Sequence, residues 1–81
     1  MVSQHSLEIA RRAEAIYAER LQAQLEATHK SKFVAIEPDS QEYFLGNTLS
    51  EAIQAARRAY PGRKSFAMRI GEPMHLGVLF S

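Results

Sequence analysis

The segment from residue 33 to residue 61 constrains the fold of this chain more than any other. It reads as an apolar run, an acidic turn, a second apolar run and an alanine-rich stretch that stops at a Pro-Gly pair. Residues 33–36 are apolar at both strand parities, which is typical of a strand covered on two faces. Turn-forming residues at 37–40 and a return strand at 43–45 complete a predicted hairpin.

A helix and two further strands are predicted after the hairpin. Thr48-Leu49-Ser50-Glu51 is a capping box, in which the Thr48 hydroxyl and the Glu51 carboxylate each accept a hydrogen bond from the backbone of the other residue. The helix that begins there is expected to end at Tyr60-Pro61. Alternating apolar residues predict a half-exposed strand over 65–70 and a weaker strand over 74–80.

The first part of the chain predicts one long helix over about residues 6–28. Strong helix formers dominate there, and neither Gly nor Pro interrupts them. The resulting order is α-β-β-α-β-β. We therefore expect a single small α+β domain over 1–81, with a mainly antiparallel four-stranded sheet and two helices. The pattern leaves the strand order open, and leaves open whether helices cover both sheet faces or a dimer covers one.

An apolar stripe on the first helix suggests a contact surface. About 22 helical residues reach roughly 33 Å, whereas strands of five or six residues reach only about 20 Å. The helix is therefore expected to overhang the sheet and to expose Tyr17, Leu21 and Leu25 as a partner or dimer surface. The alternative is a shorter helix.

Composition narrows the class of protein. The chain has 81 residues, no cysteine and a formal net charge of +1. No disulfide or thiolate metal site can form, and a small domain without disulfides is expected to be cytoplasmic. We expect no signal peptide and no membrane contact. His5, His29 and His75 do not share metal-ligand spacing, so neither metal nor cofactor is expected.

Two groups of charged residues are candidate sites. Glu37, Asp39 and Glu42 could bind a cation or act as acid and base, but solvated turn residues are the favoured interpretation. Without a glycine-rich phosphate loop or a Ser-His-Asp arrangement, we expect no enzyme. A candidate anion or nucleic-acid patch contains four cations within eight residues: Arg57, Arg58, Arg63 and Lys64. A solvated helix end is the favoured interpretation of that patch.

Residues 33–60 resemble HicB-type antitoxins. The resemblance is carried by Phe33, Ala35, Pro38-Asp39, Gly46-Asn47-Thr48, Glu51-Ala52 and Ala56. It implies a truncated ribonuclease-H-like fold without catalytic carboxylates, in a protein that blocks a small toxin and in many cases binds operator DNA. A long helix stands here where that family has its first strand. The whole chain is also similar to a group of short uncharacterised bacterial proteins, through Lys32–Ile36, Tyr43–Gly46 and Arg69–Gly71.

The resemblance and the missing catalytic set together predict a non-enzymatic protein-interaction or regulatory module, antitoxin-like or a small adaptor. We expect a homodimer that binds a small protein partner. The alternative is a nucleic-acid-binding protein that uses the basic residues around 57–64.

Overall fold

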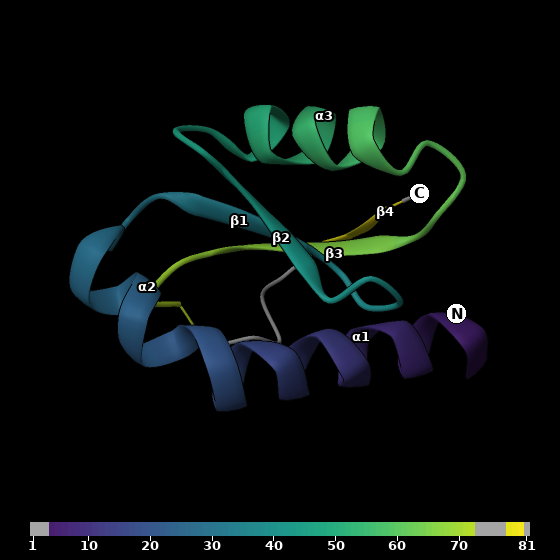
Figure 1. Cartoon of the computed structure of the whole chain (residues 1–81), viewed down its shortest axis with the longest axis horizontal. Coiled ribbons are helices and arrows are strands. Elements are labelled where there is room, and N and C mark those ends of the chain that lie inside the picture. Colours follow the sequence, from purple (N-terminus) through teal and green to yellow (C-terminus); the bar gives the residue numbers. More distant parts are fainter. Residues whose placement is uncertain (1–3, 73–77, 81) are drawn as a thin grey trace.

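Helical segments cover both faces of an antiparallel sheet, which gives the protein three layers (Figure 1). The structure, a computed structural model, describes residues 4–72 and 78–80. In chain order the elements are α1 (Gln4–Ile16), the π-helical η1 (Tyr17–Leu21), α2 (Gln22–Thr28), β1 (Phe33–Glu37), β2 (Glu42–Gly46), α3 (Leu49–Ala59), β3 (Ser65–Arg69) and β4 (Val78–Phe80).

The sheet confirms the α+β class and the order α-β-β-α-β. Its central part is antiparallel, and Ile36 of β1 pairs with Tyr43 of β2 on one side and with Phe66 of β3 on the other. The predicted strand over 74–80 lies partly outside the described residues. Its last part, β4, pairs with β3, so the strand order is β2-β1-β3-β4.

Both faces of β1 are covered, as its doubly apolar sequence predicts. The first helical layer consists of α1, η1 and α2. Val34 and Ile36 pack into one core with side chains of this layer. Ala35 packs into a second core on the opposite face, together with alanines of β3 and α3. All three side chains are fully buried. Helices on both faces provide this cover within one copy of the chain.

The prediction of a half-exposed strand over 65–70 is wrong. Ser65 and Ala67, which would form its solvent side, are both buried. The reason is topological, because β3 is an inner strand with α3 packed over one face. The residues on that face are small, which allows α3 to approach the strand closely. In the sequence, large and small side chains alternate in the same way as buried and exposed ones, so the pattern predicts that the small residues are exposed.

The apolar stripe of the first helical layer does not overhang the sheet. In η1 the Gln22 amide donates to the Tyr17 carbonyl, which is the i to i+5 bond of a π-helix. Beyond this point the layer changes direction, and α2 follows the end of the sheet (Figure 1). Tyr17, Leu21 and Leu25 remain over the sheet and are only 2%, 7% and 1% exposed. The prediction that these three residues form an exposed dimer surface is therefore wrong.

Across the described part of the chain, every helix is too short or too polar to cross a membrane.

Candidate interaction site at the β2 edge

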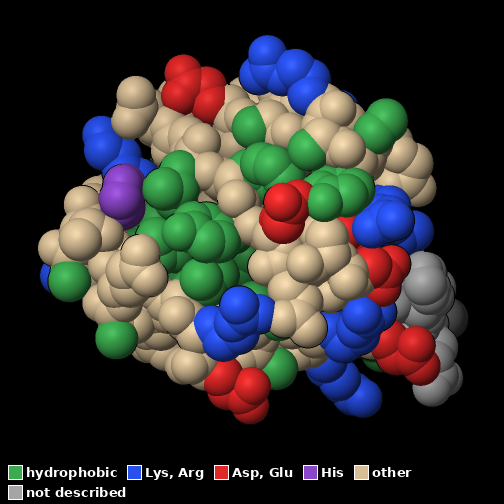
Figure 2. Space-filling model, in the orientation of Figure 1, with side chains coloured by type: hydrophobic (Ala, Val, Ile, Leu, Met, Phe, Trp, Pro, Cys, Tyr) green, Lys and Arg blue, Asp and Glu red, His purple; other side chains and the backbone are tan. Residues whose placement is uncertain are grey.

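β2 is an edge strand with apolar side chains along it. Within the described structure it pairs only with β1, so one side of its backbone has no strand partner. Tyr43, Phe44 and Leu45 are each half-buried. Tyr43 and Leu45 pack against the core below the first helical layer, whereas Phe44 packs against the α3 core. Hydrophobic side chains accordingly gather on the face of the molecule that β2 crosses (Figure 2).

Apart from the exposed charge of Glu42 at its start, β2 has few of the features that usually prevent edge strands from pairing with other chains. Natural edge strands are protected by lysine, proline, bulges or very short length. The five residues of β2 include neither lysine nor proline. They pair one for one with five residues of β1, so there is no bulge. On the side away from β1, β2 therefore has neither a strand partner among the described residues nor a lysine, proline or bulge.

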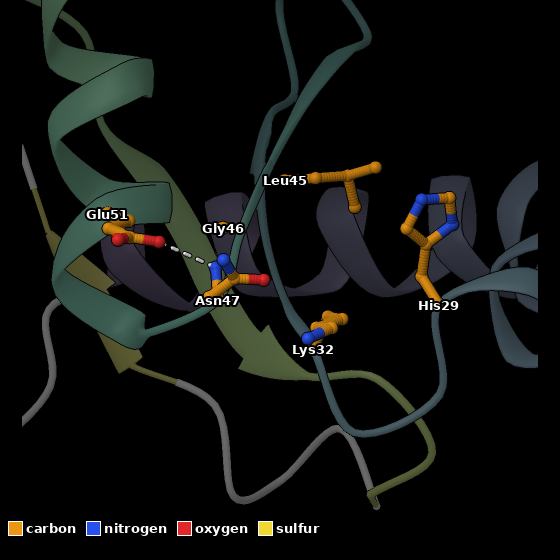
Figure 3. A pocket seen from close by; sticks show the side chains of 6 residues that line it. All are labelled: His29, Lys32, Leu45, Gly46, Asn47 and Glu51. Carbon is orange, nitrogen blue, oxygen red and sulfur yellow. Dashed lines mark hydrogen bonds between the residues drawn. The ribbon is translucent and has the colours of Figure 1, made fainter.

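A pocket of about 260 Å³ lies where β2 ends. It is lined by His29, Lys32, Leu45, Gly46, Asn47 and Glu51 (Figure 3). The Glu51 carboxylate lies on the α3 side and accepts a hydrogen bond of 2.7 Å from the Asn47 amide. Lys32 contributes an ammonium group to the same pocket. The lining therefore combines one ammonium group, one carboxylate and the apolar side chain of Leu45.

The capping box fixes the α3 side of this pocket. The Thr48 hydroxyl accepts a hydrogen bond of 3.1 Å from the Glu51 amide, which confirms Thr48 as the N-cap. The second half of the box differs from the prediction, because Glu51 bonds the Asn47 amide rather than that of Thr48. This bond ties the end of β2 to the first turn of α3.

At the other end of β2, an exposed carboxylate is held in place by aromatic residues. Glu42 accepts a hydrogen bond from the Tyr60 hydroxyl, and this bond raises the pKa of Tyr60. The Tyr60 ring meets Phe44 edge to face, with centroids 6.2 Å apart. The guanidinium of Arg63 lies 4.9 Å from the centre of the same ring. Glu42 is thus positioned on the α3 side of the edge.

The interpretation of the acidic turn as solvated is wrong for Glu37, whose side chain is only 1% exposed. Its carboxylate accepts hydrogen bonds from the amides of Asp39 (2.8 Å) and Ser40 (2.9 Å) and from Arg63 (3.0 Å). Burial raises the pKa of Glu37, but these hydrogen bonds outweigh burial and the net pKa is lowered. Glu37 therefore stabilises the hairpin as an ionised group.

The first helical layer contacts the same turn from the opposite side. Arg12 lies 2.8 Å from the Asp39 carboxylate and donates to the Pro38 carbonyl at 3.3 Å. Arg20 donates to the Gln41 side chain. The hairpin that presents β2 is thus held on one side by α1 and η1 and on the other by the loop after α3, and Asp39 of the turn forms an ion pair with Arg12 of α1.

The structure divides the predicted basic patch. Arg57 and Arg58 are exposed on the last turn of α3, whereas Lys64 is half-buried. Arg63 is directed toward Glu37 and stacks on Tyr60. Arg63 is therefore already neutralised within the chain. The nucleic-acid role of this patch stays a prediction.

Of the three histidines considered as metal ligands, His29 is the one whose side chain the structure describes. Its Nδ1 lies 2.7 Å from the Thr28 hydroxyl, at the rim of the pocket. The side chain of His5 and all of His75 lie outside the described parts. Over the residues that are described, no three His, Cys, Asp or Glu side chains group closely enough to hold a metal.

No protein-family model, curated protein or solved structure matches this chain. The resemblance to HicB-type antitoxins and to the short bacterial proteins therefore stays a prediction.

Proposed function

We propose that this protein is a non-enzymatic interaction module that binds an extended segment of a partner along β2. The observation that carries the proposal is the unprotected apolar edge from Tyr43 to Leu45. Strand addition at such an edge obtains affinity from main-chain hydrogen bonds and specificity from pockets for alternate side chains. The pocket at Gly46 supplies such a place directly beside the strand.

The energetics favour a short apolar and acidic segment as the ligand. Each main-chain hydrogen bond to β2 contributes about 0.5–1.5 kcal/mol, and cross-strand apolar pairs contribute roughly 0.2–1 kcal/mol each. Tyr43 and Leu45 offer apolar contacts on one face, and Phe44 offers one on the other. Lys32 favours an acidic side chain at the Gly46 end. An antitoxin-like or adaptor role is one use of such a surface.

The nucleic-acid alternative has weaker support. Arg63 is engaged by Glu37, and phosphate binding depends on the number of cations that remain available. The alternative expects binding to duplex DNA that weakens as salt rises and when Arg57 and Arg58 are both replaced by alanine.

Peptide selection combined with hydrogen exchange tests the proposed function. The purified chain is used to select ligands from a random-peptide library, and exchange is then measured with the selected peptide. We expect peptides with alternating apolar residues and an acidic residue, and slower exchange at Tyr43, Phe44 or Leu45. Leu45→Lys should abolish binding, whereas Glu8→Lys, at an exposed position on α1, should retain it. Protection confined to α3, or a monomeric chain that selects no ligand, would contradict the proposal.

A further inference from the structure

We infer that the extended segment bound by β2 is the β2 strand of a second copy of this chain, paired antiparallel about a two-fold axis. The inference rests on the proposed function, because it names the partner of the same edge. It concerns β2 and the pocket at Gly46, and not the buried stripe of the first helical layer.

Symmetry restricts the register of such a pair. A two-fold axis perpendicular to the sheet keeps like faces together, so opposite residues must point to the same face, and a slip of one residue would break this match. All five residues of β2 overlap only when Phe44 lies opposite the partner's Phe44. Tyr43 then lies opposite the partner's Leu45, and Glu42 lies opposite the partner's Gly46.

Each pair in this register is chemically matched. The two Phe44 rings meet on the α3 face, where each is half-buried. On the other face, Tyr43 of each copy meets Leu45 of the other copy. Both contacts lie next to the core below the first helical layer of one copy. Aromatic pairs and pairs of aromatic and aliphatic residues are the ones that stabilise neighbouring strands. The half-buried side chains of one edge thus cover those of the other.

The charges at the two ends of β2 are also complementary. The exposed Glu42 marks one end, and the pocket containing Lys32 marks the other. Antiparallel pairing brings Glu42 of each copy to Gly46 of the other, beside the pocket that Lys32 lines. Glu51 also lines this pocket, but its Oε1 is already bonded to the Asn47 amide. The bond from Tyr60 involves Oε2 of Glu42 and leaves Oε1 available to Lys32.

Cysteine cross-linking tests the register directly, because the chain contains no cysteine of its own. Opposite residues on antiparallel strands have Cα atoms about 4.5–5.5 Å apart, within the roughly 4.4–6.8 Å that a disulfide spans. A mixture of Tyr43→Cys and Leu45→Cys chains should form a mixed disulfide readily. Either variant alone should cross-link much more slowly. Two Phe44→Cys chains should cross-link with each other, because residue 44 lies on the two-fold axis.

A charge exchange tests the complementarity by sedimentation equilibrium. Glu42→Lys and Lys32→Glu should each weaken association several-fold, and the double variant should recover most of the loss. Tyr60→Phe removes only the hydrogen bond within the chain and should associate like the wild type. Glu8→Lys makes the same change of net charge as Glu42→Lys at an exposed position on α1, and it should also associate normally.

The outcomes separate this inference from the proposed function. A mixed disulfide that forms only when Tyr43→Cys and Leu45→Cys chains are combined supports the two-fold pairing. Equally fast cross-linking by Tyr43→Cys alone contradicts it. A monomeric chain without the mixed disulfide, but with a selected peptide that slows exchange in β2, contradicts the second copy and leaves the proposed function standing. A monomeric chain whose peptides protect other elements contradicts both.

Discussion

The Glu37 carboxylate lies 3.0 Å from the Arg63 guanidinium, where the end of β1 meets the loop after α3. The two partners differ in environment, because the side chain of Glu37 is 1% exposed and that of Arg63 is 48% exposed. Glu37 also accepts hydrogen bonds from two turn amides. The pair therefore joins the hairpin that presents β2 to the loop between α3 and β3.

Replacing Glu37 should cost more stability than replacing Arg63. Glu37→Gln should lower the free energy of unfolding by about 1.5–3 kcal/mol, since hydrogen bonds to a buried charge are lost. Arg63→Ala should lower it by about 1 kcal/mol or less, because water screens the half-exposed partner. Urea denaturation measures both, and Arg58→Ala, on an exposed part of α3, serves as the control. Equal effects of the Glu37 and Arg63 variants would contradict the assigned burial.

The lowered pKa of Glu37 predicts loss of stability in acid. The folded state holds this carboxyl ionised more strongly than the unfolded state does, so the unfolded state binds more protons. The contribution is present above the unfolded pKa and is lost as the pH falls through the folded pKa. Free energies of unfolding measured from neutral to acidic pH should show a shallower slope for Glu37→Gln than for the wild type. A Glu8→Gln control should keep the wild-type slope.

The raised pKa of Tyr17 predicts a corresponding loss of stability at alkaline pH. Burial, and then the 3.0 Å hydrogen bond to Glu26, raise the pKa of Tyr17 from 10.0 to about 12, although a backbone hydrogen bond with Gly71 acts in the opposite direction. The stability that Tyr17 contributes is therefore fully present below pH 10 and is lost as the pH rises toward 12. Tyr17→Phe should flatten this alkaline decrease while lowering stability at neutral pH by about 1 kcal/mol. An unchanged alkaline slope would mean that the Tyr17 phenol ionises normally.

The close packing of α3 against Gly46 predicts that a larger residue at this position destabilises the fold. A Cβ atom there would lie 2.6 Å from the Ala52 amide nitrogen and 2.8 Å from the Glu51 Cβ, too close for either to remain in place. Gly46→Ala should destabilise the fold by about 1–3 kcal/mol. Gly62→Ala is the matched control, because no atom lies within 4 Å of its added Cβ. Thermal unfolding of both variants checks the difference, and a Gly46→Ala protein as stable as the control would contradict the close packing.

Local patterns predicted much of the fold. Thr48 and Glu51 placed the start of α3, and the doubly apolar β1 predicted cover on both faces. The π-helical turn could not be predicted, because Tyr17 to Leu21 contains neither glycine nor proline and reads as ordinary α-helix. That single turn changes the direction of the layer and converts a predicted overhanging stripe into core.

The position of the candidate site could not be predicted from the sequence, because it depends on the strand order. Tyr43 to Leu45 was predicted as a strand, but only the order β2-β1-β3-β4 makes it an edge. The burial of Glu37 depends on Arg63, which lies 26 residues away in the chain. Nothing local in either residue indicates that contact. Long-range ion pairs and sheet edges are tertiary features, and a single sequence shows their residues without showing their neighbours.

Hydrogen exchange at β2 over a wide range of protein concentration distinguishes a β2 edge that pairs with a second copy from one that does not. If two copies pair along this edge, exchange at amides within Tyr43 to Leu45 slows as the concentration rises, and Leu45→Lys removes that dependence. Exchange rates in β2 that stay the same from the lowest to the highest concentration would contradict the pairing.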